Sequence, residues 1–126
     1  MHILIVEDQR ERITCFNFQL IGCAVTFVDK PKDAIALLAE KEWDCLFLDH
    51  DLEGPWICPS GPGTGYEVAC WLEEHPAKQP KVIITHTFNE KGAENICRAL
   101  PNAMYFPRCW QNSKLKDIIE ALHRGP

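Results

Sequence analysis

Two acidic clusters follow two apolar runs of this chain, and they are its best candidates for chemistry. Asp49 and Asp51 follow an apolar run at 45–48, and the pair Glu7 and Asp8 follows another. Such runs are typical of buried parallel strands, whose carboxyl ends lie at the sheet edge where ligands bind. Carboxylates gathered there repel one another unless a cation lies among them. The sequence therefore predicts a divalent metal ion, Mg²⁺ or Mn²⁺, together with a phosphate-bearing ligand.

The length and composition indicate one soluble globular domain covering residues 1–126. Of its residues, 46% are hydrophobic and 25% are charged, and the formal net charge is −5. This charge argues against a broad basic surface, so sequence-specific DNA binding is not expected. No apolar stretch reaches membrane-spanning length, and a strand pattern begins at once without a leader. We therefore expect a cytoplasmic protein that has no membrane partner.

The seven cysteines predict reduced thiols rather than a disulfide framework. Their number is odd, no Cys-x-x-Cys occurs, and most lie within apolar segments. Disulfides also require an oxidising compartment, for which this sequence carries no signal. Most of the thiols should pack as small apolar groups. Cys58 and Cys109 lie in loop-like contexts near the acidic edge, so reactivity is the alternative for these two.

Strand and helix patterns alternate from one end of the chain to the other. Strands are expected at 2–7, 24–28, 46–49, 81–85 and 103–106. Helices are expected at 10–21, 31–40, 65–75 and 90–100, with a last helix that begins near a Ser113 cap. Five such units with short connections predict an α/β fold, in which helices cover both faces of a five-stranded parallel sheet.

One connection, at 53–64, is much longer than the others. It directly follows the acidic residues of the third expected strand, and it contains Trp56. Long loops without secondary structure are usually functional or disordered in compact domains. We expect this loop to close over the acidic edge with Trp56 as a stacking surface, and a surface insertion without function is the alternative.

These residues resemble the receiver domain of two-component response regulators over essentially the whole chain. The resemblance implies a flavodoxin-like fold with strand order 2-1-3-4-5. It implies that Glu7 and Asp8 hold Mg²⁺, that Asp49 is the phospho-accepting aspartate, and that the carbonyl of Asp51 completes the metal shell. Thr85 stands where receivers place the hydroxyl that contacts the phosphoryl group. Gly65 matches the glycine that opens the third helix.

Three departures from the receiver pattern point to a narrower group. The lysine of the fifth strand is absent, and Arg108 is the nearest cation. The loop after Asp49 is about twice the ordinary length, and two histidines, His50 and His86, flank the site. These features are similar to the cyclic-phosphate-processing receiver-like family, whose pattern resembles residues 48–52, 64–68, 71–72 and 86–89. The resemblance implies hydrolysis or processing of a cyclic or terminal phosphate.

Three functions follow from this constellation. A metal-dependent phosphoesterase would use His50 and His86 as general base and acid on a small phosphate compound such as a cyclic nucleotide. In that enzyme the phosphate would be positioned by Thr85 or Thr87, Asn89 and Arg108. A single-domain response regulator would instead accept a phosphoryl group on Asp49 from a histidine kinase or another phosphodonor. A non-catalytic nucleotide- or protein-binding relic is the third.

Overall fold

A computed structural model describes residues 1–52 and 57–125 of the chain. Five strands form one parallel sheet in the order β2-β1-β3-β4-β5, which confirms the predicted flavodoxin-like α/β architecture. The strands are β1 (His2–Val6), β2 (Ala24–Val28), β3 (Cys45–Leu48), β4 (Val82–Thr85) and β5 (Met104–Tyr105). The helices are α1 (Arg10–Gln19), α2 (Pro31–Glu40), α3 (Gly65–Glu74), α4 (Glu90–Ala99) and α5 (Leu115–Arg124), with short 3-10 turns η1 (Pro76–Lys78) and η2 (Cys109–Gln111).

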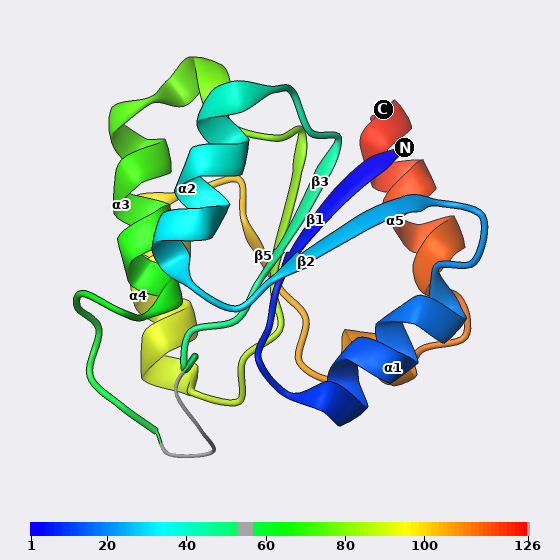
Figure 1. The fold of residues 1–126 in the computed structure, drawn as a ribbon, viewed down its shortest axis with the longest axis horizontal. Helices are drawn as coiled ribbons and strands as arrows, with labels where there is room; N and C mark the ends of the chain where they lie inside the picture. Colours follow the sequence, from blue (N-terminus) through cyan, green and yellow to red (C-terminus); the bar gives the residue numbers. More distant parts are fainter. Residues whose placement is uncertain (53–56, 126) are drawn as a thin grey trace.

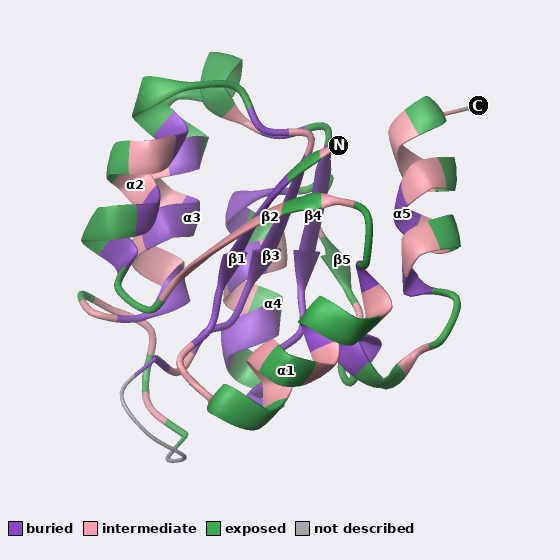
Figure 2. Cartoon of the chain, turned by 45° about the vertical axis from the view of Figure 1, so that its right-hand side comes forward, coloured by how far each residue is buried: buried purple, intermediate pink, exposed green. Residues whose placement is uncertain are grey.

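The helices form a layer on each face of the sheet. Helices α2, α3 and α4 cover one face, and α1 and α5 cover the other (Figure 1). Two apolar clusters fill the two interfaces, because side chains of a parallel strand alternate between its faces. Leu4 and Leu46 pack toward the first layer, and Ile3 and Phe47 pack toward the second. Figure 2 shows the central strands as buried and β5 as exposed.

The element ends differ from the sequence-based expectation by one or two residues, and one predicted cap is wrong. The last helix does not begin at a Ser113 cap. Its N-cap is Lys114, and no side chain caps the helix there. The preceding turn is instead closed by Asn112, whose side-chain Oδ1 accepts a 2.8 Å bond from the Lys114 N–H. Asparagine competes with serine for this local role.

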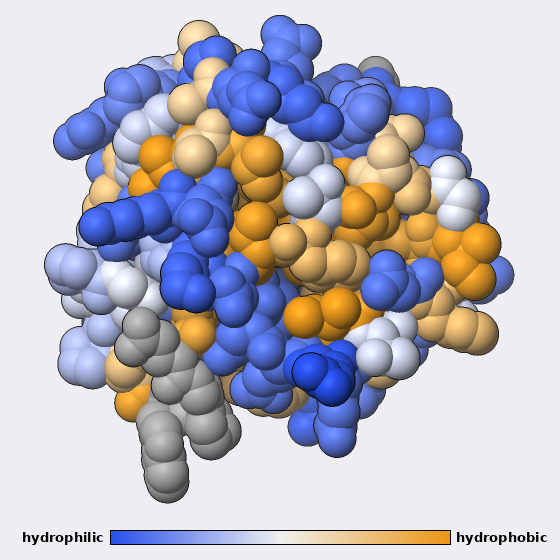
Figure 3. Space-filling model, in the orientation of Figure 1, coloured by the Kyte–Doolittle hydropathy of each residue, from blue (hydrophilic) through white to orange (hydrophobic). Residues whose placement is uncertain are grey.

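The surface over β2 and the end of α1 carries exposed apolar residues. Phe18 is 72% exposed and Ile21 is 68% exposed, and Figure 3 shows hydrophobic residues across this face of the molecule.

Among the described residues, no helix is long and apolar enough to cross a membrane.

Candidate functional site

Three polar residues lie side by side at the carboxyl edge of the sheet because their strands are in register. Val6 pairs with Leu48, and Leu48 pairs with Thr85. The next residue on each strand is Glu7, Asp49 or His86, and all three are buried. One ligand atom from each of these three lies within 4.8 Å of the others. Residues separated by up to 79 positions therefore meet at one point, as the sequence predicted for the acids of β1 and β3.

The carboxylate of Glu7 is fully occupied by hydrogen-bond donors. Its Oε2 accepts from the backbone N–H groups of Asp8 and Gln9, each at 3.0 Å. Its Oε1 accepts from His86 Nε2 at 2.9 Å and lies 3.4 Å from Arg12 Nη1. Burial alone would raise the pKa of Glu7, but the bonds from His86 and Gln9 and the charge of Arg12 lower it to about 2. Glu7 is therefore ionised across the ordinary pH range.

Asp49 is in the opposite electrostatic situation. Its Oδ1 accepts from its neighbour's N–H, that of His50, at 2.9 Å, and its Oδ2 lies 3.5 Å from Arg12 Nη1. Burial and the negative charge of Glu7 raise the pKa of Asp49 to about 8. The positive charge of Arg12 lowers this pKa but does not offset burial and the charge of Glu7. A further cation beside Asp49 would reduce the repulsion between the Asp49 and Glu7 carboxylates.

Arg12 lies between the two carboxylates and two aromatic rings. Its guanidinium carbon is 4.8 Å from the ring centroid of Phe88 and 4.6 Å from that of Trp110. The guanidinium is thus held by charge on one side and by π-faces on the other. Arg12 was not predicted from the sequence. It lies in the first turn of α1, the helix that follows the acidic pair at the end of β1.

His86 is enclosed rather than facing solvent. Its ring contacts the edges of Phe16, Phe47 and Trp110, with centroid distances of 5.2, 6.4 and 5.8 Å. Burial lowers the pKa of His86 more than the neighbouring Glu7 raises it. Among the described residues, none forms a hydrogen bond with His86 Nδ1. His86 is therefore a neutral imidazole that donates to Glu7 through Nε2.

A second polar cluster surrounds Asp51. Its Oδ1 lies 2.9 Å from His50 Nδ1 and accepts from the N–H of Cys58 at 3.1 Å and from Asn89 Nδ2 at 3.3 Å. Burial alone would raise the pKa of Asp51, but hydrogen bonds from Cys58, His50 and Asn89 lower it. The other nitrogen of the His50 ring lies 2.8 Å from Ser60 Oγ. His50 and Asn89 therefore tie the loop residues 58–60 to the carboxyl end of β3.

Two glycines, Gly65 of α3 and Gly92 of α4, pack directly against Asp49 and His50. A Cβ on Gly65 would lie 1.9 Å from the carbonyl oxygen of Asp49, and a Cβ on Gly92 would lie 2.5 Å from Cγ of His50. Gly65 also donates its N–H to the carbonyl of His50 at 2.8 Å. Only glycine allows α3 and α4 to approach this closely, so the glycine expected at the start of the third helix is explained by contact.

The two candidate threonines have different surroundings. Thr85 is fully buried, and its hydroxyl donates to the carbonyl of Leu48 at 2.7 Å. Thr87 lines a small hollow of about 50 Å³, and its Oγ1 accepts from the N–H of Asn89 at 3.1 Å. The hollow is also lined by Gln9, Arg12, Asp49, Asp51, Ile57 and Phe88. Neither His50 nor His86 belongs to its lining.

The remaining expected residues are distributed around this hollow. Asp8 is half-buried next to Glu7, and it belongs to neither of the two groups of possible metal ligands found among the described residues. Arg108 is exposed, and its guanidinium carbon lies 5.4 Å from the centroid of the Phe88 ring. Trp56, the expected stacking residue, lies outside the described residues. Phe88 and Trp110 line the region instead, and neither was predicted to be functional.

Comparison with known proteins supports the same fold. A family model described as "Cyclic-phosphate processing Receiver domain" matches residues 2–102. A search of curated proteins found no match. The receiver domain of a signal transduction histidine kinase from Syntrophus aciditrophicus is 19% identical, covers 98% of this chain and 90% of its own, and superposes with a TM-score of 0.72.

Two other solved structures have comparable sequence identities and somewhat lower TM-scores. The receiver domain of a modulated diguanylate cyclase from Desulfovibrio desulfuricans G20 is 22% identical, with a TM-score of 0.64 over 98% of this chain and 94% of its own. The Mn²⁺-bound form of the response regulator Rcp1 is 19% identical, with a TM-score of 0.61 over 98% of this chain and 89% of its own. At these identities the structures show that the fold is shared.

Proposed function

The chain belongs to the cyclic-phosphate processing receiver domain family, and on this premise we propose that it is a metal-dependent phosphoesterase acting on a cyclic or terminal phosphate. The observation that carries the proposal is the hollow at the carboxyl edge of the sheet, where Asp49, Asp51, Arg12 and Thr87 meet. Two carboxylates, a guanidinium and a hydroxyl supply the groups that a metal-bound phosphate requires.

The donor set fits a magnesium or manganese ion. Asp49 and Asp51 offer oxygen ligands to the same hollow, whose volume of about 50 Å³ accommodates an ion and bound waters. Burial and the negative charge of Glu7 raise the pKa of Asp49, and a divalent cation bound beside Asp49 would stabilise its ionised form. Glu7 is less suited to direct ligation because its acceptor positions are already taken. When bound, the ion would supply charge stabilisation for the phosphoryl oxygens.

The phosphate would contact Thr87 and Arg12. Thr87 Oγ1 accepts from the Asn89 N–H, so its own hydrogen can be donated to a phosphate oxygen. Arg12 presents a guanidinium, which binds phosphate through paired N–H groups. Thr85 keeps its hydroxyl on the Leu48 carbonyl. Arg108 does not line the hollow, but its guanidinium contacts the ring of Phe88, which does.

In this proposal the histidines orient the acids instead of contacting the substrate. His50 fixes Asp51, and His86 fixes Glu7, which in turn holds Arg12. Asp49 would act as a ligand of the metal ion, because a bound cation would replace the proton that its pKa of about 8 retains in the metal-free protein. The general base and acid roles expected for His50 and His86 from their side-chain chemistry are therefore not part of this proposal.

The direct test is phosphorus NMR of the protein incubated with 2′,3′-cyclic and 3′,5′-cyclic mononucleotides, with Mg²⁺, with Mn²⁺ or with EDTA. We expect metal-dependent turnover that EDTA abolishes, and a loss of about 100-fold in Asp51→Asn. Asp29→Asn is the matched control, because Asp29 is exposed and its ion-pair partner among the described residues is the exposed Lys30. Acetyl phosphate is tested in parallel by mass spectrometry. A persistent phosphoryl adduct on Asp49 without nucleotide turnover would reject the phosphoesterase and support the response-regulator function.

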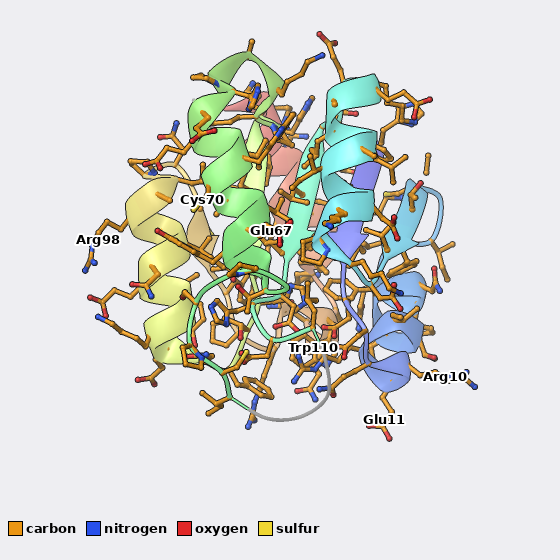
Figure 4. The ribbon with its side chains drawn as sticks, turned by 60° about the vertical axis from the view of Figure 1, so that its left-hand side comes forward. Arg10, Glu11, Glu67, Cys70, Arg98 and Trp110 are labelled. Atoms are coloured by element: carbon orange, nitrogen blue, oxygen red, sulfur yellow. The ribbon has the colours of Figure 1, made fainter. Side chains whose placement is uncertain are left out.

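Arg12 is expected to compete with the metal. Its Nη1 contacts both Glu7 and Asp49, so its positive charge repels a divalent cation at Asp49 more strongly than it repels a proton. Arg12→Ala should therefore tighten Mg²⁺ binding about 10-fold at pH 8, measured by calorimetry, while turnover falls. Arg10→Ala is the control, because Arg10 points away from the molecule at the start of α1 (Figure 4). Weaker Mg²⁺ binding in Arg12→Ala would show that the guanidinium supports the metal.

A further inference from the structure

A second cleft adjoins the hollow beside Asp49. It has a volume of about 390 Å³, which falls in the range of small-molecule sites. It shares Gln9, Arg12 and Phe88 with the hollow. Its other lining residues are Glu11, Cys15, Arg108, Trp110 and Gln111. A ligand whose phosphate lies near Asp49 would therefore place its remaining part in this cleft. Figure 4 shows Trp110 at this end of the molecule, near the start of α1.

Two aromatic residues, Phe88 and Trp110, line the cleft. Phe88 and Trp110 lie 5.5 Å apart between centroids with their planes tilted by 54°. Trp110 is almost fully buried, whereas Phe88 is 45% exposed. The guanidinium carbon of the exposed Arg108 lies 5.4 Å from the centroid of this ring, so a ligand that stacks there must displace Arg108. Exposed aromatic faces of this kind are the surfaces on which bases stack.

The charged and amide groups of the cleft suit a nucleotide. Arg12 and Arg108 approach the Phe88 ring at 4.8 and 5.4 Å. Among the described residues, Arg108 has no carboxylate within ion-pair distance. The side-chain amides of Gln9 and Gln111 offer donors and acceptors to the edge of a ring. Two arginines and one carboxylate, that of Glu11, line the cleft. Its local charge is therefore positive although the formal charge of the whole chain is −5, and this favours an anion.

We propose that this cleft binds the base of a nucleotide whose phosphate lies in the hollow beside Asp49. The base stacks on the exposed face of Phe88 and displaces the Arg108 guanidinium, which then contacts the phosphate. Phe88 thus takes the stacking role that the sequence suggested for Trp56. This inference deepens the proposed phosphoesterase function, since it names a nucleotide as the substrate class of the same site.

The experiment compares equilibrium binding of AMP, CMP, GMP and UMP with that of ribose 5-phosphate, measured by calorimetry with Mg²⁺ present. In the wild-type chain at least one nucleotide should bind about 10-fold or more tightly than the sugar phosphate, because a stacked base contributes that much. This ratio should fall to about one in Phe88→Ala and Phe88→Leu, and Phe88→Trp should retain it. Phe18→Ala is the control, because Phe18 is an exposed aromatic residue of α1 that does not line the cleft.

The outcomes separate this inference from the proposed function. Equal binding of every nucleotide and ribose 5-phosphate would overturn the base site, even if cyclic phosphates are hydrolysed. A nucleotide preference that depends on Phe88 but is accompanied by no hydrolysis would retain the base site and reject the phosphoesterase. Phe88→Ala keeps its fold if its thermal unfolding matches that of Phe18→Ala. If it does not, Phe88→Leu decides, because leucine preserves the apolar volume while removing the ring.

Discussion

Asp49→Asn is expected to raise the free energy of unfolding of the metal-free protein at pH 7.5 by several kcal/mol, with about 5 kcal/mol as the upper bound set by the raised pKa of Asp49. Burial and the charge of Glu7 raise the pKa of Asp49 from 3.8 to about 8, and each tenfold change in proton affinity corresponds to about 1.4 kcal/mol. The folded state therefore holds a proton that the unfolded state releases. Stability is lost as pH rises from about 4 to about 8, and asparagine avoids this loss.

The measurement is urea unfolding of both proteins between pH 4 and pH 8.5 with EDTA present. The advantage of the asparagine variant should be near zero at pH 4 and should grow through neutrality. Mg²⁺ should stabilise the wild-type protein and leave Asp49→Asn unchanged. Asp29→Asn, at an exposed position, should show neither effect. If the asparagine variant is less stable than wild type at pH 7.5, the ionised Asp49 side chain does not destabilise the metal-free protein. The electrostatic argument for a cation at this site would then be wrong.

The same substitution should reduce any metal-dependent turnover by at least about 100-fold, because asparagine does not carry the negative charge that would hold the metal ion. A variant that is more stable and inactive indicates a site whose strain serves function. Loss of activity with loss of stability would instead indicate a structural role for Asp49.

The fold and the central acids could be predicted because they depend on local patterns. Apolar runs that end in Glu7 and Asp49 indicate neighbouring parallel strands, and parallel strands bring their carboxyl ends together. The choice between Thr85 and Thr87 could not be made in this way. It depends on which side chain turns into the sheet, and Thr85 turns to the Leu48 carbonyl on the neighbouring strand.

Other features depend on contacts between distant segments. Arg12 reaches Asp49 across 37 positions, and no periodicity encodes that contact. The histidines were identified at the right strand ends, but their enclosure follows from packing under Gly92 and against Phe16. Side-chain burial of this kind decides whether a histidine contacts a ligand or positions another residue, and it becomes visible only when the helices are in place.

Gly65→Ala tests whether the close approach of α3 to β3 builds the site. The added Cβ would lie 1.9 Å from the Asp49 oxygen, 2.9 Å from the Asp49 carbonyl carbon and 3.2 Å from the His50 Cα. All three atoms belong to the backbone, so no side chain can rotate to relieve the clash. The start of α3 must move and weaken the Gly65 N–H bond to His50. We expect a loss of about 3 kcal/mol or more in the free energy of unfolding.

Gly61→Ala provides the matched control, because a Cβ at Gly61 meets no atom within 4 Å. Its stability should stay within about 1 kcal/mol of wild type. Both variants are measured by urea unfolding, and Mg²⁺ binding is measured for each variant that folds. The movement of α3 should also displace the Asp49 and His50 backbone, so Gly65→Ala should lose Mg²⁺ affinity while Gly61→Ala retains it. Equal stability of the two variants would mean that α3 can shift without disturbing β3, and the rigid support proposed for Asp49 would then be wrong.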